Sequence, residues 1–177
     1  KPTTTPKPVV VKPQPKPTVV ETSPKTPIVK PEPTTNWRDE YDYVDGFSEG
    51  LAAVKKNTKW GFVDETGKEV IPLVYEIAYE FSKGLAKVRF YGSYGFIDKK
   101  GKQVIPLIYN DALWFYEGLV AVEKNGKWGF LDRTGNVVIP IIYDFASNFV
   151  DGSVGVKKNG KMFYINKQGQ CIKYCPE

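Results

Sequence analysis

Residues 125–132 read NGKWGFLD, and the recurrence of this stretch decides the fold. Sixty-eight residues earlier the chain reads NTKWGFVD, and thirty-four residues earlier it reads YGSYGFID. A local pattern that returns at a fixed step is the signature of a repeat architecture. The paired positions of the four copies are Trp60-Gly61, Tyr94-Gly95, Trp128-Gly129 and Met162-Phe163.

Other residues keep the same step of 34. The recurring aromatic positions are Tyr41, Tyr75, Tyr109 and Tyr143, followed by Phe47, Phe81, Phe115 and Phe149. The recurring glycines are Gly67, Gly101, Gly135 and Gly169. These marks divide residues 37–177 into one domain of four units, at about 41–74, 75–108, 109–142 and 143–177.

Each unit has the local chemistry of β-strands. Residues 118–124 are rich in β-formers, and Asn125-Gly126 then supplies a two-residue hairpin turn. Residues 127–132 return as a second strand, and residues 136–139 form a third, which Pro140 interrupts. The connector after it spaces apolar residues by three, which suggests one helical turn. We therefore predict about twelve strands, in four three-stranded antiparallel meanders.

The Trp-Gly pair is interpreted as structural. In a strand Trp128 and Phe130 share one face while Gly129 lies on the other. We expect the Trp to pack against the neighbouring unit and the Gly to admit a close backbone. The predicted core comprises Trp60, Tyr94 and Trp128, together with Phe47, Phe81, Phe115 and Phe149.

One such meander cannot bury its own apolar face, so the units must stack. We predict an all-β domain in which they form an open, twisted array; the alternative is a small, closed, propeller-like ring. The fourth unit departs most from the pattern, as terminal repeats of open arrays do, so we interpret it as a C-terminal cap.

The repeat pattern resembles the bacterial WG repeat family, also called KWG repeats. The resemblance rests on the motif GLxxVxxxGKWGF[IVL]DxxGxxVIPxxYxxAxxF and covers residues 41–177. It implies a β-rich module of bacterial proteins, often of envelope or secreted ones. It supplies no catalytic residues. The chain departs from the motif at Tyr94 and at Met162-Phe163.

Residues 1–36 contain ten of the fourteen prolines and no aromatic residue. Such a composition favours polyproline II and cannot build a core, so we predict an extended spacer, or stalk, before the repeats. The alternative is a docking ligand, although KPQPKP lacks the P-x-x-P spacing that SH3-type grooves favour.

Charge and composition exclude several function classes. Net charge is +5, but residues 1–36 carry +4 of it, so the repeats show no basic stripe and we expect no nucleic-acid partner. Histidine is absent, so we predict no metal, no cofactor and no enzyme activity. Apolar runs are too short for a transmembrane segment. Because the first residue is Lys, we expect a processed chain or a fragment.

Several residues carry candidate chemistry. One carboxylate or amide recurs at Asp64, Asp98, Asp132 and Asn166, where we interpret it as a turn cap rather than a metal ligand. Cys171 and Cys175 are the two cysteines of the chain. An extended chain would hold their Cα atoms about 13 Å apart, so a disulfide requires a turn between them; both outcomes stay open.

Residues that break the repeat are the candidate partner contacts. Trp114 and Tyr116 flank Phe115 in columns that elsewhere hold mostly polar residues, and Tyr79 and Tyr91 are similar departures. Exposed aromatic side chains of this kind suit stacking on a glycan or a protein. Chance variation and packing between units are the alternatives.

The leading hypothesis is a non-catalytic interaction module. A β-repeat head on a Pro-rich spacer would bind a protein or a cell-surface glycan, outside the cytoplasm, at the envelope or surface of a bacterium. The alternative is a structural subunit that self-assembles into a filament or envelope assembly, its Pro-rich arm packing on a neighbour. A less favoured hypothesis is a glycan-active domain that uses Asp111 and Glu117.

Overall fold

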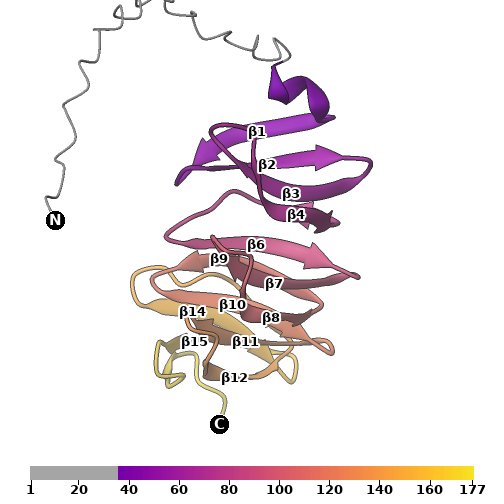
Figure 1. Cartoon of the computed structure of the whole chain (residues 1–177). Helices are drawn as coiled ribbons and strands as arrows, with labels where there is room; N and C mark the ends of the chain where they lie inside the picture. Colours follow the sequence, from indigo (N-terminus) through magenta and orange to yellow (C-terminus); the bar gives the residue numbers. More distant parts are fainter. Residues whose placement is uncertain (1–35) are drawn as a thin grey trace, which may run out of the picture. The chain divides into compact units, whose positions relative to one another are not determined.

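The computed structural model describes residues 36–177, which form four antiparallel sheets of four strands each (Figure 1). A 3₁₀ helix, η1 (Trp37–Glu40), precedes them. The first sheet contains β1 (Tyr43–Ser48), β2 (Leu51–Lys56), β3 (Lys59–Asp64) and β4 (Glu69–Tyr75). The second contains β5 (Ile77–Ala78), β6 (Leu85–Phe90), β7 (Ser93–Asp98) and β8 (Gln103–Tyr109). The third contains β9 (Asp111–Tyr116), β10 (Leu119–Lys124), β11 (Lys127–Asp132) and β12 (Val137–Tyr143). The fourth contains β13 (Phe145–Ala146), β14 (Ser153–Lys158), β15 (Lys161–Asn166) and β16 (Cys171–Lys173).

The turns follow the local sequence. Asn125 (φ 54°) and Gly126 (φ 76°) join β10 to β11 with two positive-φ residues, as a type I′ hairpin requires. After β11, the Asp132 carboxylate accepts the backbone N–H groups of Thr134 and Asn136, at 2.8 and 3.0 Å. Equivalent bonds form at Asp64, Asp98 and Asn166, so the recurring residue is a turn cap.

The connector between units is a strand, so the prediction of three-stranded meanders with a helical turn between them is wrong. It pairs as the edge strand of the next sheet: Ala112 lies opposite Val122, and Phe115 opposite Val120. Two residues of β9 therefore face one residue of β10, which is a β-bulge. The extra residue lets Ala112 and Phe115 share a face although they are three apart, which imitates helical spacing.

Consecutive sheets pack face to face and share their cores. The recurring ring pairs across the interfaces are Phe62–Phe81, Phe96–Phe115 and Phe130–Phe149, with centroids 4.8 to 5.0 Å apart. Buried clusters join the first sheet to the second, the second to the third and the third to the fourth. Within residues 36–177 no such cluster joins the first sheet to the last, so the array is open, as predicted (Figure 1).

The Trp of the repeat is not a central core residue, which corrects the prediction for Trp60, Tyr94 and Trp128. Each is half-buried, because it is the second residue of its strand and lies at the margin of the sheet beside the hairpin turn. Fully buried residues follow two positions later, at Phe62, Phe96 and Phe130. Of the recurring Phe column, Phe81 and Phe149 are buried, whereas Phe47 and Phe115, on complete edge strands, are half-buried.

The Gly of the repeat, on the third strand of its sheet, lies against the fourth strand. A Cβ at Gly129 would lie 2.6 Å from the Cα of Ile141. At Gly61 and Gly95 it would lie 2.6 Å from the carbonyl oxygens of Ile71 and Ile105. This is the close approach of a backbone that the sequence predicted, and no larger residue fits without separating the strands.

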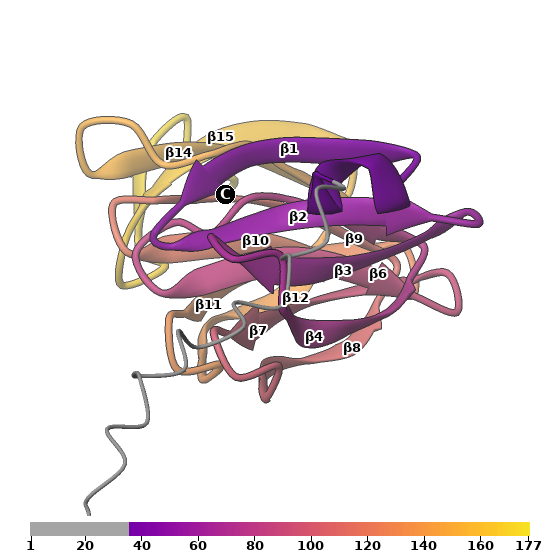
Figure 2. The ribbon, with the colours of Figure 1, turned by 45° about the horizontal axis from the view of Figure 1, so that its top comes forward.

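The two ends of the array differ. At the first sheet, the 3₁₀ helix η1 lies beside β1 and β2 (Figure 2). Its Trp37 packs with Tyr41 on the outer face, against the cluster of Ala52, Val54 and Val63. At the last sheet, the outer face exposes Met162 and Tyr164, to 50% and 40%. Tyr164 occupies the column of the buried Phe62, Phe96 and Phe130, so the fourth unit leaves uncovered a face that the other units bury.

The chain ends in a disulfide between Cys171 and Cys175, whose Cα atoms lie 5.7 Å apart. Tyr174, with φ at 56°, turns the chain between them and brings them within bridging distance. The predicted Pro-rich spacer of residues 1–36 lies, except for Asn36, outside the described residues.

Candidate functional site

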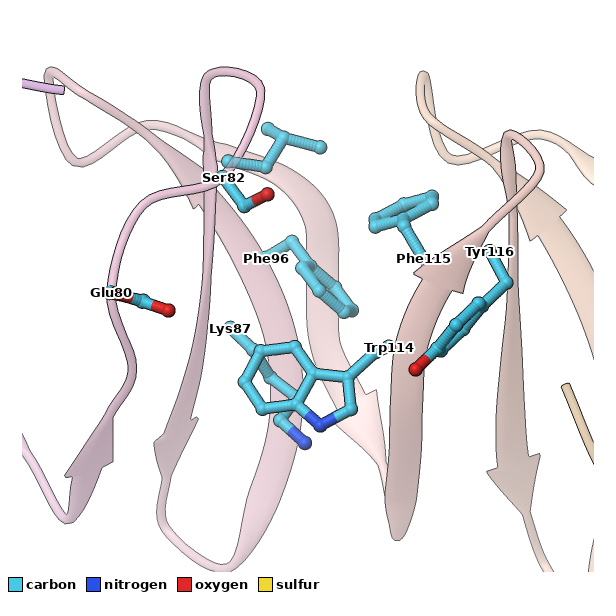
Figure 3. Close-up of a pocket in the computed structure, with 8 residues that line it drawn as sticks. Glu80, Ser82, Lys87, Phe96, Trp114, Phe115 and Tyr116 are labelled. Carbon is cyan, nitrogen blue, oxygen red and sulfur yellow. The ribbon is translucent and has the colours of Figure 1, made fainter. Parts of the chain in front are cut away.

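The candidate site lies between the second and third sheets, where the bulge of β9 places Trp114. Leu113 and Trp114 together oppose Ala121 of β10, and a bulge of this kind redirects the side chains at its position. The indole of Trp114 extends from β9 across to Lys87 of β6 (Figure 3). A ring of the second unit, Tyr79, meets the indole edge to face, with centroids 4.9 Å apart.

Lys87 is the buried charge of the site, with 7% of its surface exposed. Its ammonium donates a hydrogen bond to the carbonyl oxygen of Ala112, at 3.0 Å. It also lies 4.2 Å from the ring centre of Trp114 and 4.5 Å from that of Tyr79, with Tyr94 at 5.5 Å. The aromatic faces therefore surround a cation, an arrangement that stabilises positive charge out of water.

Burial sets the protonation of these groups. Removal from water lowers the pKa of Lys87, and the Asp111 carboxylate opposes that shift. Burial also raises the pKa of Tyr79, with smaller contributions from Tyr94 and Asp111. The site thus holds its cation away from solvent with only a distant carboxylate to offset it.

Two hollows adjoin at this place. The first, called here the Lys87 cleft, has a volume of about 150 Å³ and is lined by Glu80, Ser82, Leu85, Lys87, Phe96, Trp114, Phe115 and Tyr116 (Figure 3). The second, called here the Trp60 groove, lies between the first and second sheets. It has a volume of about 370 Å³ and is lined by Tyr43, Asp45, Lys55, Trp60, Ile77, Ala78 and Tyr79. Tyr79 lines the groove and contacts Trp114 of the cleft, so it connects the two.

The structure brings together three of the four aromatic residues singled out from the sequence. Trp114 and Tyr116 line the Lys87 cleft and are 40% and 46% exposed, and Tyr79 packs on Trp114. Tyr91 is separate from them: it lies on the β6–β7 turn, is 83% exposed and packs on Phe90.

The suggested carboxylate pair is not assembled. Asp111 begins β9 and Glu117 follows its last residue, so an extended strand holds them about 20 Å apart. Glycosidase carboxylates lie between roughly 5 and 9.5 Å apart. Glu117 instead accepts the N–H of Gly152 and pairs with Lys167, and the hydrogen bond from Lys167 lowers its pKa.

Lys87 was missed by the sequence reasoning although its column carried a signal. The equivalent positions hold Ala53, Ala121 and Gly155, so a lysine there departs from a column of small residues. Ala53 and Ala121 are buried in the clusters between neighbouring sheets. A charged residue in a small, buried column was the available clue.

Two further findings concern the described residues, 36–177. They contain no group of three or more Cys, Asp or Glu side chains that could hold a metal ion. None of their helices has the length and apolar character needed to cross a membrane.

Geometry and repetition together define the chain as an open array of β-sheet repeats with one modified interface. The family described as "WG containing repeat" matches residues 40–60, 60–92, 94–128 and 128–161. The chain therefore belongs to the WG repeat family. A search of curated proteins gave no match.

Solved structures show only distant likeness. Hsv2 of Kluyveromyces lactis matches with a TM-score of 0.47 and 8% identity, over 76% of this chain and 50% of that one. The extracellular domain of BT4673 from B. thetaiotaomicron matches with a TM-score of 0.40 and 15% identity, over 77% of this chain and 25% of that one. This chain thus spans half or less of either structure, and neither likeness bears on function.

Proposed function

We propose that the chain is a non-catalytic binding module that takes a protein or glycan partner of the bacterial cell envelope at the Lys87 cleft. One observation carries the proposal. Tyr79, Lys87, Trp114 and Tyr116 each depart from the repeat, and these four departures come from two units yet meet at a single place. Neutral variation in a repeat would scatter over the array.

The chemistry of the cleft suits binding. Trp114 and Tyr116 line the cleft and are 40% and 46% exposed. Their backbone belongs to the bulged strand β9, which holds both side chains in place. Aromatic side chains fixed in this way lose little conformational entropy when a partner stacks on them. Glu80 and Ser82 add hydrogen-bonding groups at the rim.

An extracytoplasmic, envelope setting is supported by two features. Disulfides persist in oxidising compartments, and Cys171 and Cys175 are bridged. The Pro-rich composition of residues 1–36 is that of a spacer that holds a domain away from an anchor.

The test is retention of the full chain by bacterial envelope fractions, separated into protein and polysaccharide. We expect the W114A/Y116A double variant to lose at least tenfold in apparent affinity. Tyr91→Ala is the matched control, because Tyr91 is equally aromatic and more exposed but lies outside the cleft. Equal retention of the double variant and the wild type, or no retention of either, would contradict the proposal.

A second candidate function, a self-assembling structural subunit, is favoured by the outer face of the fourth sheet. Tyr164 is exposed where the other sheets bury the same column, at Phe62, Phe96 and Phe130, and Met162 is exposed beside it, so this face could pack on a neighbouring molecule. The Pro-rich arm would then lie on that neighbour. Protease protection of residues 1–36 only at assembling concentrations would support this function, and a monomer at every concentration would exclude it.

A further inference from the structure

The ammonium of Lys87 has hydrogen-bonding capacity that the protein does not use. It carries three N–H donors, and one is taken by the carbonyl oxygen of Ala112. Among residues 36–177 no carboxylate oxygen lies within 4.0 Å of it. The aromatic rings stabilise its charge but neutralise none of it. A charge that is 93% buried by surface normally has an ionic partner, so the cleft holds a cation that lacks its anion.

We propose that the Lys87 cleft binds an acidic sugar, whose carboxylate pairs with the Lys87 ammonium while its ring stacks on Trp114 and Tyr116. This inference rests on the proposed function and names the ligand of the same site. A carboxylate oxygen can accept a charge-assisted hydrogen bond from an N–H group that remains on Lys87.

The size of the cleft limits the ligand. At about 150 Å³ it is smaller than the usual small-molecule pocket of 300 to 1,000 Å³, and it suits one ring or one ring substituent. The remaining sugar units would lie outside, along the exposed aromatic faces. The cleft would therefore hold one sugar residue of a glycan at a time.

Nearby acids restrict the charge of the ligand. Glu80 lines the cleft, and Asp111 acts electrostatically on Lys87. One carboxylate can reach the ammonium, but a run of negative charges would also meet these two acids. The surroundings therefore favour a sugar with one carboxylate, whose hydroxyl groups can donate to Glu80, over an acidic peptide.

The test compares two oligosaccharides of equal length, one ending in glucuronate and one in glucose, by titration calorimetry with the full chain. We expect the glucuronate probe to bind at least tenfold more tightly. Lys87→Met should abolish that preference, because it keeps the length of the side chain and removes the charge. Lys87→Ala repeats the test with the residue that Ala53 and Ala121 show to fit this column.

Lys55→Met is the matched control. Lys55 also lies over a tryptophan, Trp60 at 5.9 Å, but it belongs to the neighbouring groove and is less buried. We expect its affinity for glucuronate to stay within twofold of the wild type.

Distinct outcomes separate this inference from the proposed function. Equal binding of the two sugars, a glucuronate preference that survives in both Lys87 variants, or tighter binding of a glutamate-rich peptide would overturn the inference. If a neutral glycan or an envelope protein still depends on Trp114, the proposed function stands. If Trp114 affects no partner, both fail.

Discussion

Replacing Gly129 by Ala tests why the repeat needs a glycine after its tryptophan. The new Cβ would lie 2.6 Å from the Cα of Ile141 and 2.7 Å from its backbone nitrogen. Those atoms belong to β12, which pairs with β11, so no rotamer change can relieve the clash. The two strands must separate locally.

The magnitude follows from two opposing terms. Overpacking a well-packed site typically costs 1 to 3 kcal/mol, and a rigid backbone neighbour places this variant at the upper end, near ~3 kcal/mol. Replacing Gly by Ala also reduces the conformational entropy of the unfolded chain, which stabilises the folded state by about 0.4 to 1 kcal/mol. We expect a net loss of about 2 kcal/mol in the free energy of unfolding. For a domain of this size that lowers the melting temperature by about 4 to 8 °C.

The assay is thermal and urea unfolding followed by circular dichroism, with Gly155→Ala as the matched control. Gly155 lies on β14 in the column of Ala53 and Ala121, and its added Cβ would meet only side-chain atoms at ordinary contact distance, the Tyr164 ring at 3.6 Å and the Met162 Cε at 3.9 Å. We expect this control to be neutral or to stabilise by up to about 1 kcal/mol. A loss below about 0.5 kcal/mol for Gly129→Ala, or equal losses for the two variants, would refute the reasoning.

Two further predictions concern the same unit. Phe130→Ala should lower the free energy of unfolding by about 3 to 5 kcal/mol, measured with urea, because Phe130 is 1% exposed. Trp128→Ala should lower it clearly less, because Trp128 is half-buried. The reverse order would show that the tryptophan is the core residue. The Thr134 hydroxyl, with backbone N–H groups of Thr134 and Asn136, lowers the pKa of Asp132 from 3.8 to about 2. The ionised Asp132 therefore contributes its full stabilisation above the unfolded pKa of 3.8, and this stabilisation is lost as the pH falls through the folded pKa of about 2. Asp132→Asn, which copies Asn166, should keep the turn and remove that pH dependence, measured by acid unfolding and an NMR titration; an unchanged acid profile would contradict this.

The repeat period was readable from the sequence because the same physical demand recurs in each unit. The hairpin turn at Asn125-Gly126 needs two residues with positive φ, and the turn after β11 needs a side chain such as Asp132 to accept its N–H groups. These are local requirements, so residue type alone signals them. The open stacking was predictable for a similar reason, since the fourth unit lacks the Gly that the other three place against the fourth strand of their sheets.

The first strand of each sheet, which the connector forms, was not predictable from local spacing. A bulge adds one residue between Ala112 and Phe115, so two apolar residues on one face stand three apart, as they would on a helix. Only the pairing with β10 reveals that this segment is a strand. The site was half predictable: departures from the repeat marked Trp114 and Tyr116, but their meeting with Lys87 depends on how the sheets stack.

The position of the site follows from how the three interfaces between sheets differ. Between the first and second sheets, Glu49 accepts the N–H of Gly84 at 3.0 Å and pairs with Lys99 at 3.2 Å. Between the third and fourth, Glu117 makes the same contacts with Gly152 and Lys167.

At the middle interface this bridge is replaced, because the equivalent positions hold Lys83 and Arg133, and Arg133 donates to the carbonyl oxygens of Ser82 and Lys83. Ser82 also lines the Lys87 cleft, so the altered bridge and the cleft share one loop. The outer interfaces keep the repeated polar contact that holds the array together. At the middle interface the Arg133 side chain contacts main-chain carbonyl oxygens instead, and the residues of the candidate site lie at this interface.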